Sequence, residues 1–272
     1  MVLGSRFLVR LGLAGTLLAT GCSPFDSCPT IAEIQPALDR LPSHLSETGL
    51  FEPDGKQLAA GVVQYTPGFQ LWSDGAEKRR FIFLPEGAVI DVSDPDDWQF
   101  PKGTKVWKEF TRDGVRVETR LLFKYGDGAA DWAAAAYLWN DANADADLAP
   151  LGLANARGTG HDVPPADRCM GCHAGRAGRV LGFSALQLGN APEGSLSLDD
   201  LARWGWLSGG LPSTAIPGSP TERAALGYLH ANCSHCHNQG RPESAGPRCY
   251  DPENGLDMFL VLGELGTVGA TP

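Results

Sequence analysis

The chain has 272 residues, which is long enough for one large domain or two ordinary domains with buried cores. It carries 22 basic and 32 acidic side chains and a net charge of −10. This balance argues against nucleic-acid binding, for which a basic surface is expected. It permits electrostatic steering toward a basic partner, which is a rate effect that salt screens.

Residues 1–21 are typical of a signal peptide of the lipoprotein type. Arg6 and Arg10 precede an apolar run, from Leu11 to Ala19, that is too short to span a bilayer. The small residues before Cys22 predict cleavage there and a lipid on Cys22 that anchors the protein to a membrane, in the periplasm or cell envelope. The alternative is a soluble periplasmic protein cut near Cys22. Loss of Arg6 and Arg10 leaves 20 bases against 32 acids, a mature net charge of −12.

Residues 22–57 are expected to form a tether with one weak helix, in which Leu38, Leu41 and Leu45 recur at helical spacing. Residues 58–150 alternate β-branched and aromatic runs with turn residues. This pattern predicts about six antiparallel strands, closed as a sandwich or a small barrel. Asp113-Gly114 is the strongest hairpin signal. The expected strands are 62–72, 79–84, 88–92, 104–110, 115–123 and 132–139.

Two CxxCH motifs follow, Cys169, Cys172 and His173 in the first and Cys233, Cys236 and His237 in the second. Residues three and four apart share one face of a helical turn. Two thiols can therefore bond the vinyl groups of one porphyrin while the next imidazole reaches the iron. This is the attachment pattern of c-type haem, and it predicts two covalently attached haems c.

Helix signals accompany both motifs. Ser219, Pro220 and Glu222 provide an N-cap, a proline at the first helical position and a capping-box partner. A helix start at Ala166 and a helix over 197–207 are also expected. The fold class predicted from these signals is α+β, with the β domain followed by a mainly α-helical, cytochrome c-like di-haem region. Its first haem region is 151–218 and its second is 219–272.

Zinc is the main alternative for the four motif cysteines, and a thiol redox pair is another. Zinc ribbons place their cysteine pairs about 15–20 residues apart. Cys172 and Cys233 are 61 positions apart, and each pair is followed directly by a histidine that zinc does not require. The spacing therefore favours haem.

The block YTPGFQLWSDGAEKRRFIFLPEGAVIDVSDPDDWQFPKGTKVWKEF, with VETRLLF, AAYLWND, CMGCH, LGFSALQL and HANCSHCHN, resembles a family of uncharacterised bacterial di-haem c-type cytochromes. Genes of this family often neighbour a parallel β-helix repeat protein. The resemblance covers about residues 48–238 and implies haem binding and electron transfer by an exported protein, with that repeat protein among the candidate partners. Family members continue further past the second motif, whereas this chain ends 35 residues after His237, so the second haem region is expected to be incomplete.

The sixth iron ligand decides what each haem can do, because methionine raises the potential, histidine lowers it and an open position permits catalysis. Met258 is the candidate for the second haem. His161, or else His44, is the candidate for the first, unless that site is open. Each of these side chains could equally be a packing or surface residue. The remaining cysteines, Cys28 and Cys249, form either a disulfide or two free thiols.

Two polar clusters can be interpreted either as binding sites or as solvent-exposed charged segments. The group at 72–80 includes Lys78, Arg79 and Arg80 and could bind a partner or a haem propionate, although a turn with solvated charges is the simpler interpretation. The alternating acids from Asp141 to Asp147 resemble a calcium loop but lack its glycine and its bidentate acid, which favours a solvated loop.

The leading functional interpretation is an electron carrier that passes single electrons between redox partner proteins. No nucleophile or acid-base pair stands out in the sequence, so an electron-transfer protein is favoured over a catalyst. The alternatives are a di-haem peroxidase or oxidase and a partner-binding module with accessory haems.

Overall fold

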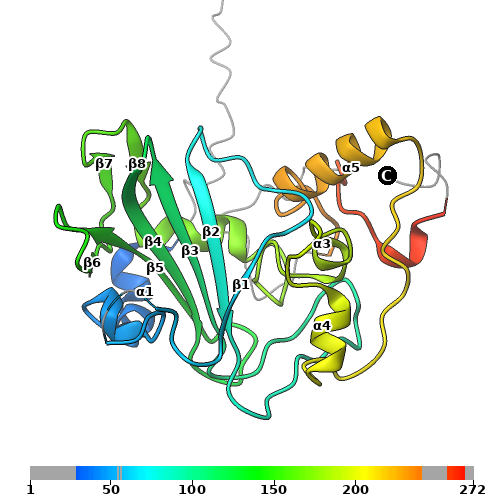
Figure 1. The fold of residues 1–272 in the computed structure, drawn as a ribbon, viewed down its shortest axis with the longest axis horizontal. Helices are drawn as coiled ribbons and strands as arrows, with labels where there is room; N and C mark the ends of the chain where they lie inside the picture. The colour runs from blue at the N-terminus through cyan, green and yellow to red at the C-terminus, as the bar shows by residue number, and fades with distance from the viewer. Residues whose placement is uncertain (1–28, 54, 56, 241–255, 267–272) are drawn as a thin grey trace, which may run out of the picture.

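The computed structural model describes residues 29–53, 55, 57–240 and 256–266. The signal peptide, the lipidation of Cys22 and the Cys28–Cys249 pair lie outside the described residues. Six strands form one antiparallel sheet in sequential order, and two further strands pair separately (Figure 1). The sheet contains β1 (Val62–Tyr65), β2 (Glu77–Phe83), β3 (Lys105–Arg112), β4 (Val115–Lys124), β5 (Trp132–Trp139) and β6 (Ala146–Leu148), and the pair is β7 (Leu153–Ala156) and β8 (His161–Val163).

The helices are short. The α-helices are α1 (Ile31–Leu38), α2 (Cys169–His173), α3 (Ala185–Gly189), α4 (Leu198–Arg203) and α5 (Pro220–Asn232). Single 3-10 turns lie at Leu45–Thr48, Ala166–Arg168 and Leu262–Glu264. None of the described helices is long and apolar enough to cross a bilayer.

The β3–β4 hairpin confirms the expected turn at Asp113-Gly114. Arg112 pairs with Val115, and the two turn residues have φ values of 50° and 78°. Positive φ at both central positions is the geometry of the two-residue hairpin turn whose twist matches the strands. The hairpin places β3 and β4 at the centre of the sheet.

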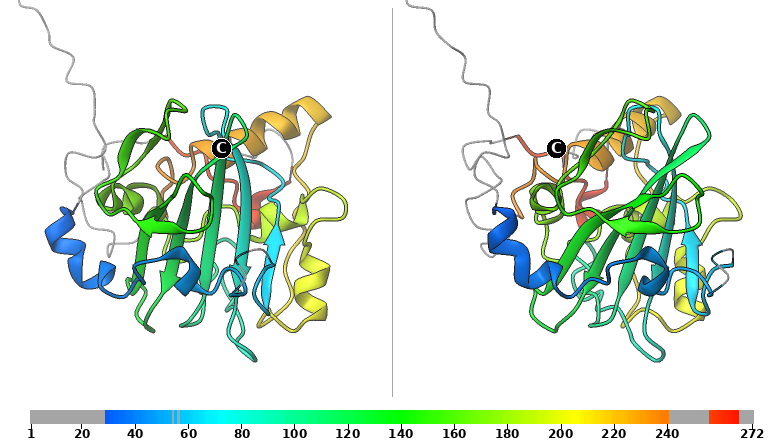
Figure 2. Two further views of the ribbon diagram at one scale, coloured as in Figure 1. Left: turned by 60° about the vertical axis from the view of Figure 1, so that its left-hand side comes forward. Right: turned by 90° about the vertical axis from the view of Figure 1, so that its left-hand side faces the viewer.

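The sheet buries both of its faces. On one face, Phe81, Trp107 and Tyr137 pack against leucines of the N-terminal segment, and the Trp107 indole donates a 3.1 Å hydrogen bond to Thr48 Oγ1. This segment, with α1, crosses one side of the sheet, while α3, α4 and α5 lie on the other (Figure 2). Alternate side chains of each strand therefore face different partners.

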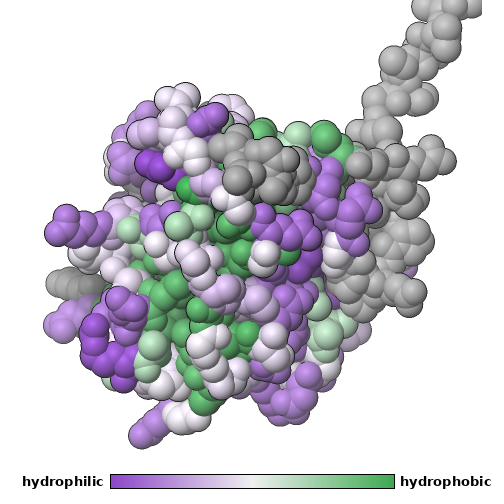
Figure 3. Space-filling model, turned by 90° about the vertical axis from the view of Figure 1, so that its right-hand side faces the viewer, coloured by the Kyte–Doolittle hydropathy of each residue, from purple (hydrophilic) through white to green (hydrophobic). Residues whose placement is uncertain are grey.

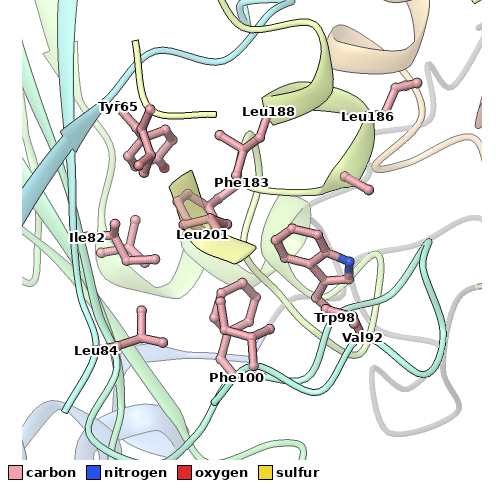
Figure 4. Packing of buried hydrophobic residues seen from close by; sticks show 14 of the residues in the cluster. Tyr65, Ile82, Leu84, Val92, Trp98, Phe100, Phe183, Leu186, Leu188 and Leu201 are labelled. Atoms are coloured by element: carbon pink, nitrogen blue, oxygen red, sulfur yellow. The ribbon is translucent and has the colours of Figure 1, made fainter. Parts of the chain in front are cut away.

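The second face shares its core with the chain that follows the sheet. Ile82 of β2 and Leu84, which follows the strand, face Phe183, Leu188 of α3 and Leu201 of α4, with Tyr65, Trp98 and Phe100 around them (Figure 4). Tyr65 and Phe183 meet edge to face with ring centroids 4.9 Å apart. One hydrophobic cluster thus joins residues on both sides of position 150. Apolar surface emerges among polar side chains on the side that carries α4 and α5 (Figure 3).

The expected mainly α-helical, cytochrome c-like region is wrong. The described chain is dominated by the antiparallel sheet, and four of its five α-helices have only five to eight residues. The physical reason is that residues 164–217, in which the only α-helices are the short α2, α3 and α4, cover an open sheet face, so their apolar side chains do not need long helices to be buried. The sheet is also open, with β1 and β6 as edges, instead of a sandwich or a small barrel.

One strand prediction also fails, and one strand of the sheet was not predicted. Residues 88–92 form only isolated bridges, in which Ile90 pairs with Leu207 and Asp91 with Gln99. The short β6 lies instead in the acidic segment that was compared with a calcium loop. Both errors have one cause, because pairing with other parts of the fold decides whether such a short segment forms a strand.

Candidate functional site

The first CxxCH motif lines a cavity of about 260 Å³ on the second face of the sheet. Cys169, Cys172 and His173 lie on one side, in the single turn of α2. The opposite wall comes from strands β3, β4 and β5. Apart from the motif, the cavity is lined by Leu71, Val106, Lys108, Arg120, Leu121, Leu122, Ala134, Ala135, Pro164, Arg168, Val180 and Leu181. A mostly apolar cleft with a few polar groups is the usual form of a cofactor site.

The His173 side chain is arranged as a metal ligand. Its Nδ1 lies 2.7 Å from the carbonyl oxygen of Arg179, which can only accept, so Nδ1 carries the proton. The lone pair is therefore on Nε2. Burial, with the positive charge of Lys108, lowers the pKa of His173 to about 3, so the ring is neutral. A neutral imidazole whose other nitrogen donates to a backbone carbonyl is the form that ligates metals.

Arg179, which orients His173, has a strained backbone. Its φ of 58° is in the left-handed region, which non-glycine residues seldom adopt. Its buried guanidinium donates to Ala129 O at 3.2 Å and to the Met170 sulfur at 3.7 Å. These contacts hold the carbonyl in position against the strain.

The two motifs meet in space although they are far apart in sequence. The thiols of Cys172 and Cys236 share a hydrogen bond, which together with the charge of Lys108 lowers the pKa of Cys172 to about 7 against the effect of burial. Gly175 allows this approach, because a Cβ there would overlap the backbone carbonyl of His235. The prediction of two separate motif regions did not anticipate this contact.

Helix α5 leads into the second motif as predicted. Ser219 Oγ accepts from the backbone N–H of Glu222, and the Glu222 carboxylate accepts from the Ser219 N–H at 2.7 Å. The Met258 N–H donates to His237 O at 2.9 Å, so the candidate ligand Met258 is close to the second motif. Cys233, Cys236 and His237 do not line the large cavity. The structure therefore defines the surroundings of the first motif better than those of the second.

Other candidate ligands have partners elsewhere. His161 Nε2 lies 2.7 Å from Glu118 Oε1, and His44 Nδ1 lies 2.9 Å from Asp147 Oδ1. Neither histidine lines the large cavity, and Met170 packs on the core. Ligation of the first iron by His161 stays a prediction, and it would need Nδ1 or the loss of the Glu118 contact.

The cavity wall also holds basic side chains whose convergence sequence reasoning missed. In the strand register Arg80 lies opposite Lys108, and Lys108 lies opposite Arg120. Lys108 and Arg120 line the large cavity, and Arg80 and Lys108 line a smaller one that also contains Leu71 and Leu181. We call Arg80, Lys108 and Arg120 the basic row. The alternation of side chains along each strand shows which residues of that strand share a face. Only the register between strands shows that Arg80, Lys108 and Arg120 lie side by side.

The residues around the first motif fit a c-type haem. Two thiols and a neutral imidazole with a free lone pair on Nε2 face an apolar cleft, and cations are available for carboxylates. In the part of the chain that the structure describes, no three His, Cys, Asp or Glu side chains gather where they could hold a metal ion.

No family model, curated protein or solved structure matches this chain. The resemblance to di-haem c-type cytochromes therefore stays a prediction that rests on the quoted sequence blocks. The functional argument depends on the site itself.

Proposed function

We propose that the chain is an exported c-type cytochrome that carries two covalent haems and transfers single electrons between redox partner proteins. The observation that supports this most is His173, whose imidazole is buried, neutral and oriented by a backbone carbonyl beside two thiols and an apolar cleft. Iron in a bound haem would supply the chemistry, by cycling between its ferrous and ferric states.

The residues of the chain would hold and insulate the group. Cys169 and Cys172 would bond the vinyl carbons through their sulfurs, and His173 Nε2 would ligate the iron. The leucines, valines and alanines of the cleft would exclude water, and this exclusion tunes the potential. Cys233, Cys236 and His237 would do the same for the second haem, with Met258 as its candidate sixth ligand.

The proposal includes export and a lipid anchor, because haem attachment and the first 22 residues both suit a compartment outside the cytoplasm. A β-helix repeat protein is a candidate partner through the family resemblance alone. Labelled palmitate should enter the wild-type protein and not the Cys22→Ser variant. Equal labelling of both would reject the anchor.

The test of haem binding is a pyridine haemochrome spectrum with intact mass on protein matured in a host that attaches haem c. The wild type should carry two haems that survive acidified organic solvent. Cys169→Ala/Cys172→Ala and Cys233→Ala/Cys236→Ala should each carry one. Protein that is colourless, or whose pigment is extracted, would contradict the proposal.

A di-haem peroxidase or oxidase is the second candidate. It is favoured by the first site, where His161 and Met170 are engaged by Glu118 and Arg179 and His173 is the one imidazole on the cavity wall among the described residues. An open iron position permits catalysis. Turnover of hydrogen peroxide with a reduced dye would support this candidate, and its absence would leave electron transfer.

A further inference from the structure

The basic row is costly for the sheet that carries it. Arg80, Lys108 and Arg120 lie directly opposite one another on three neighbouring strands and on the same face. Like charges in such cross-strand pairs destabilise a sheet, and burial increases the cost. Arg80 is only 3% exposed. Lys78, two residues before it on β2, adds a fourth cation to this face.

The described residues neutralise this charge only in part. Glu118 pairs with Arg120 through two hydrogen bonds of 2.9 and 2.6 Å. Arg80 reaches only the neutral amide oxygen of Gln70, at 3.3 Å, and Lys78 donates to the carbonyl of Leu71. Lys108 makes no hydrogen bond or ion pair with another described residue. Among the described residues, four basic side chains thus share this face with one carboxylate.

The row also lies where an anion could reach it. Lys108 lines both the large cavity and the smaller one, with Arg120 on the first and Arg80 on the second. The motif cysteines and His173 line the same large cavity. An anionic ligand that enters this cleft would meet both the motif and the basic side chains.

We propose that the basic row binds the propionate carboxylates of the haem attached at Cys169 and Cys172, with Lys108 as the central cation. This inference rests on the proposed function. A haem carries two carboxylates, and Arg and Lys are the side chains that pair with them. The negative charge of the two propionates would neutralise the basic row. It would therefore offset the cost of placing three basic side chains opposite one another in the sheet. Of the three basic residues at 78–80, only Lys78 and Arg80 lie on the face of the basic row. Arg79 lies on the opposite face and pairs with Glu109 at 2.6 Å.

The test compares Lys108→Leu, Lys108→Arg and the exposed control Lys102→Leu in protein matured with haem. The haem content is measured first, by pyridine haemochrome. An optical redox titration and the propionate bending mode in resonance Raman spectra follow. Loss of a cation near the iron favours the ferric state, so Lys108→Leu should weaken reduction of one haem about tenfold, or about 59 mV, and shift the bending mode. Lys108→Arg should restore both values, and Lys102→Leu should match the wild type.

Each other result overturns the inference. With two haems attached, an unchanged potential and Raman mode in Lys108→Leu would exclude the propionate contact, as would an equal shift of both haems. A change to a high-spin spectrum in both Lys108 variants would make Lys108 an iron ligand instead, because Arg cannot replace it in that role. If Lys108→Leu does not fold, Arg80→Gln replaces it in the test, and it should lower the potential of the same haem. Colourless wild-type protein would instead reject the proposed function.

Discussion

Replacement of Glu118 by glutamine tests the electrostatics of the cavity wall. Glu118 is fully buried, accepts two hydrogen bonds from Arg120 and pairs with His161 at 2.7 Å. Removing one partner of a buried ion pair costs roughly 3–5 kcal/mol. Because the Arg120 side chain is 34% exposed and Gln keeps an acceptor, we expect the lower end, about 3 kcal/mol. The measurement is guanidinium unfolding of the matured protein followed by circular dichroism.

A double-mutant cycle separates charge from packing. If Glu118 offsets the basic row, Glu118→Gln should cost less in a Lys108→Leu background, with a coupling of about 0.5–3 kcal/mol. Glu109 is the matched control, since it is equally buried but pairs with Arg79 and Arg116 on the opposite face. Its coupling to Lys108 should be near zero. A Glu118→Gln cost under about 1 kcal/mol, or the same cost in both backgrounds, would refute the reasoning.

The pH dependence of the same variant has a defined sign. Burial raises the pKa of Glu118, but Arg120 and His161 outweigh it, so the pKa lies below its ordinary value. A lowered carboxyl pKa contributes stability above the unfolded pKa of about 4.3, and this contribution is lost as the pH falls through the folded value. The difference in unfolding free energy between wild type and Glu118→Gln should therefore shrink below about pH 4. A difference that stays constant to pH 2 would contradict the assignment.

Three further substitutions test the packing of the motifs, each by chemical unfolding. Gly175→Ala should cost about 1–3 kcal/mol, because its Cβ would overlap the His235 carbonyl, whereas Gly263→Ala has free space and should be neutral. Gly227→Ala should destabilise α5 although alanine favours helices, since its Cβ would strike the Phe69 ring, and the cost should fall in a Phe69→Leu background. Ser219→Ala should cost about 1 kcal/mol through loss of the capping box, while Thr221→Ala, at an exposed position in the same turn, should be silent.

Local signals in the sequence predicted local structure well. The capping box at Ser219 and the hairpin at Asp113-Gly114 are present as predicted, because each is decided by a few neighbouring residues. One helix length was predicted wrongly. The helix expected over 197–207 ends at Arg203, where Gly205 with φ of 69° reverses the chain and lets Trp206 N–H bond to Leu201 O. This glycine C-cap is itself a local signal, which the expectation of a helix to residue 207 overlooked.

The amino-acid sequence identified the CxxCH motif of the candidate site but not its basic row, because the row depends on contacts between distant segments. CxxCH is a local pattern, so Cys169, Cys172 and His173 could be singled out as candidates from sequence alone. The basic row comes from β2, β3 and β4, and strand alternation says only that Arg79 and Arg80 face opposite ways. Which of them faces the motif depends on the register that pairs Arg80 with Lys108, and a slip of one residue would place Arg79 there instead. That register follows from the apolar residues, because Ile82, Val106 and Leu122 must share one core. The hydrophobic core thus fixes which charges meet the proposed haem, although no charged residue specifies it.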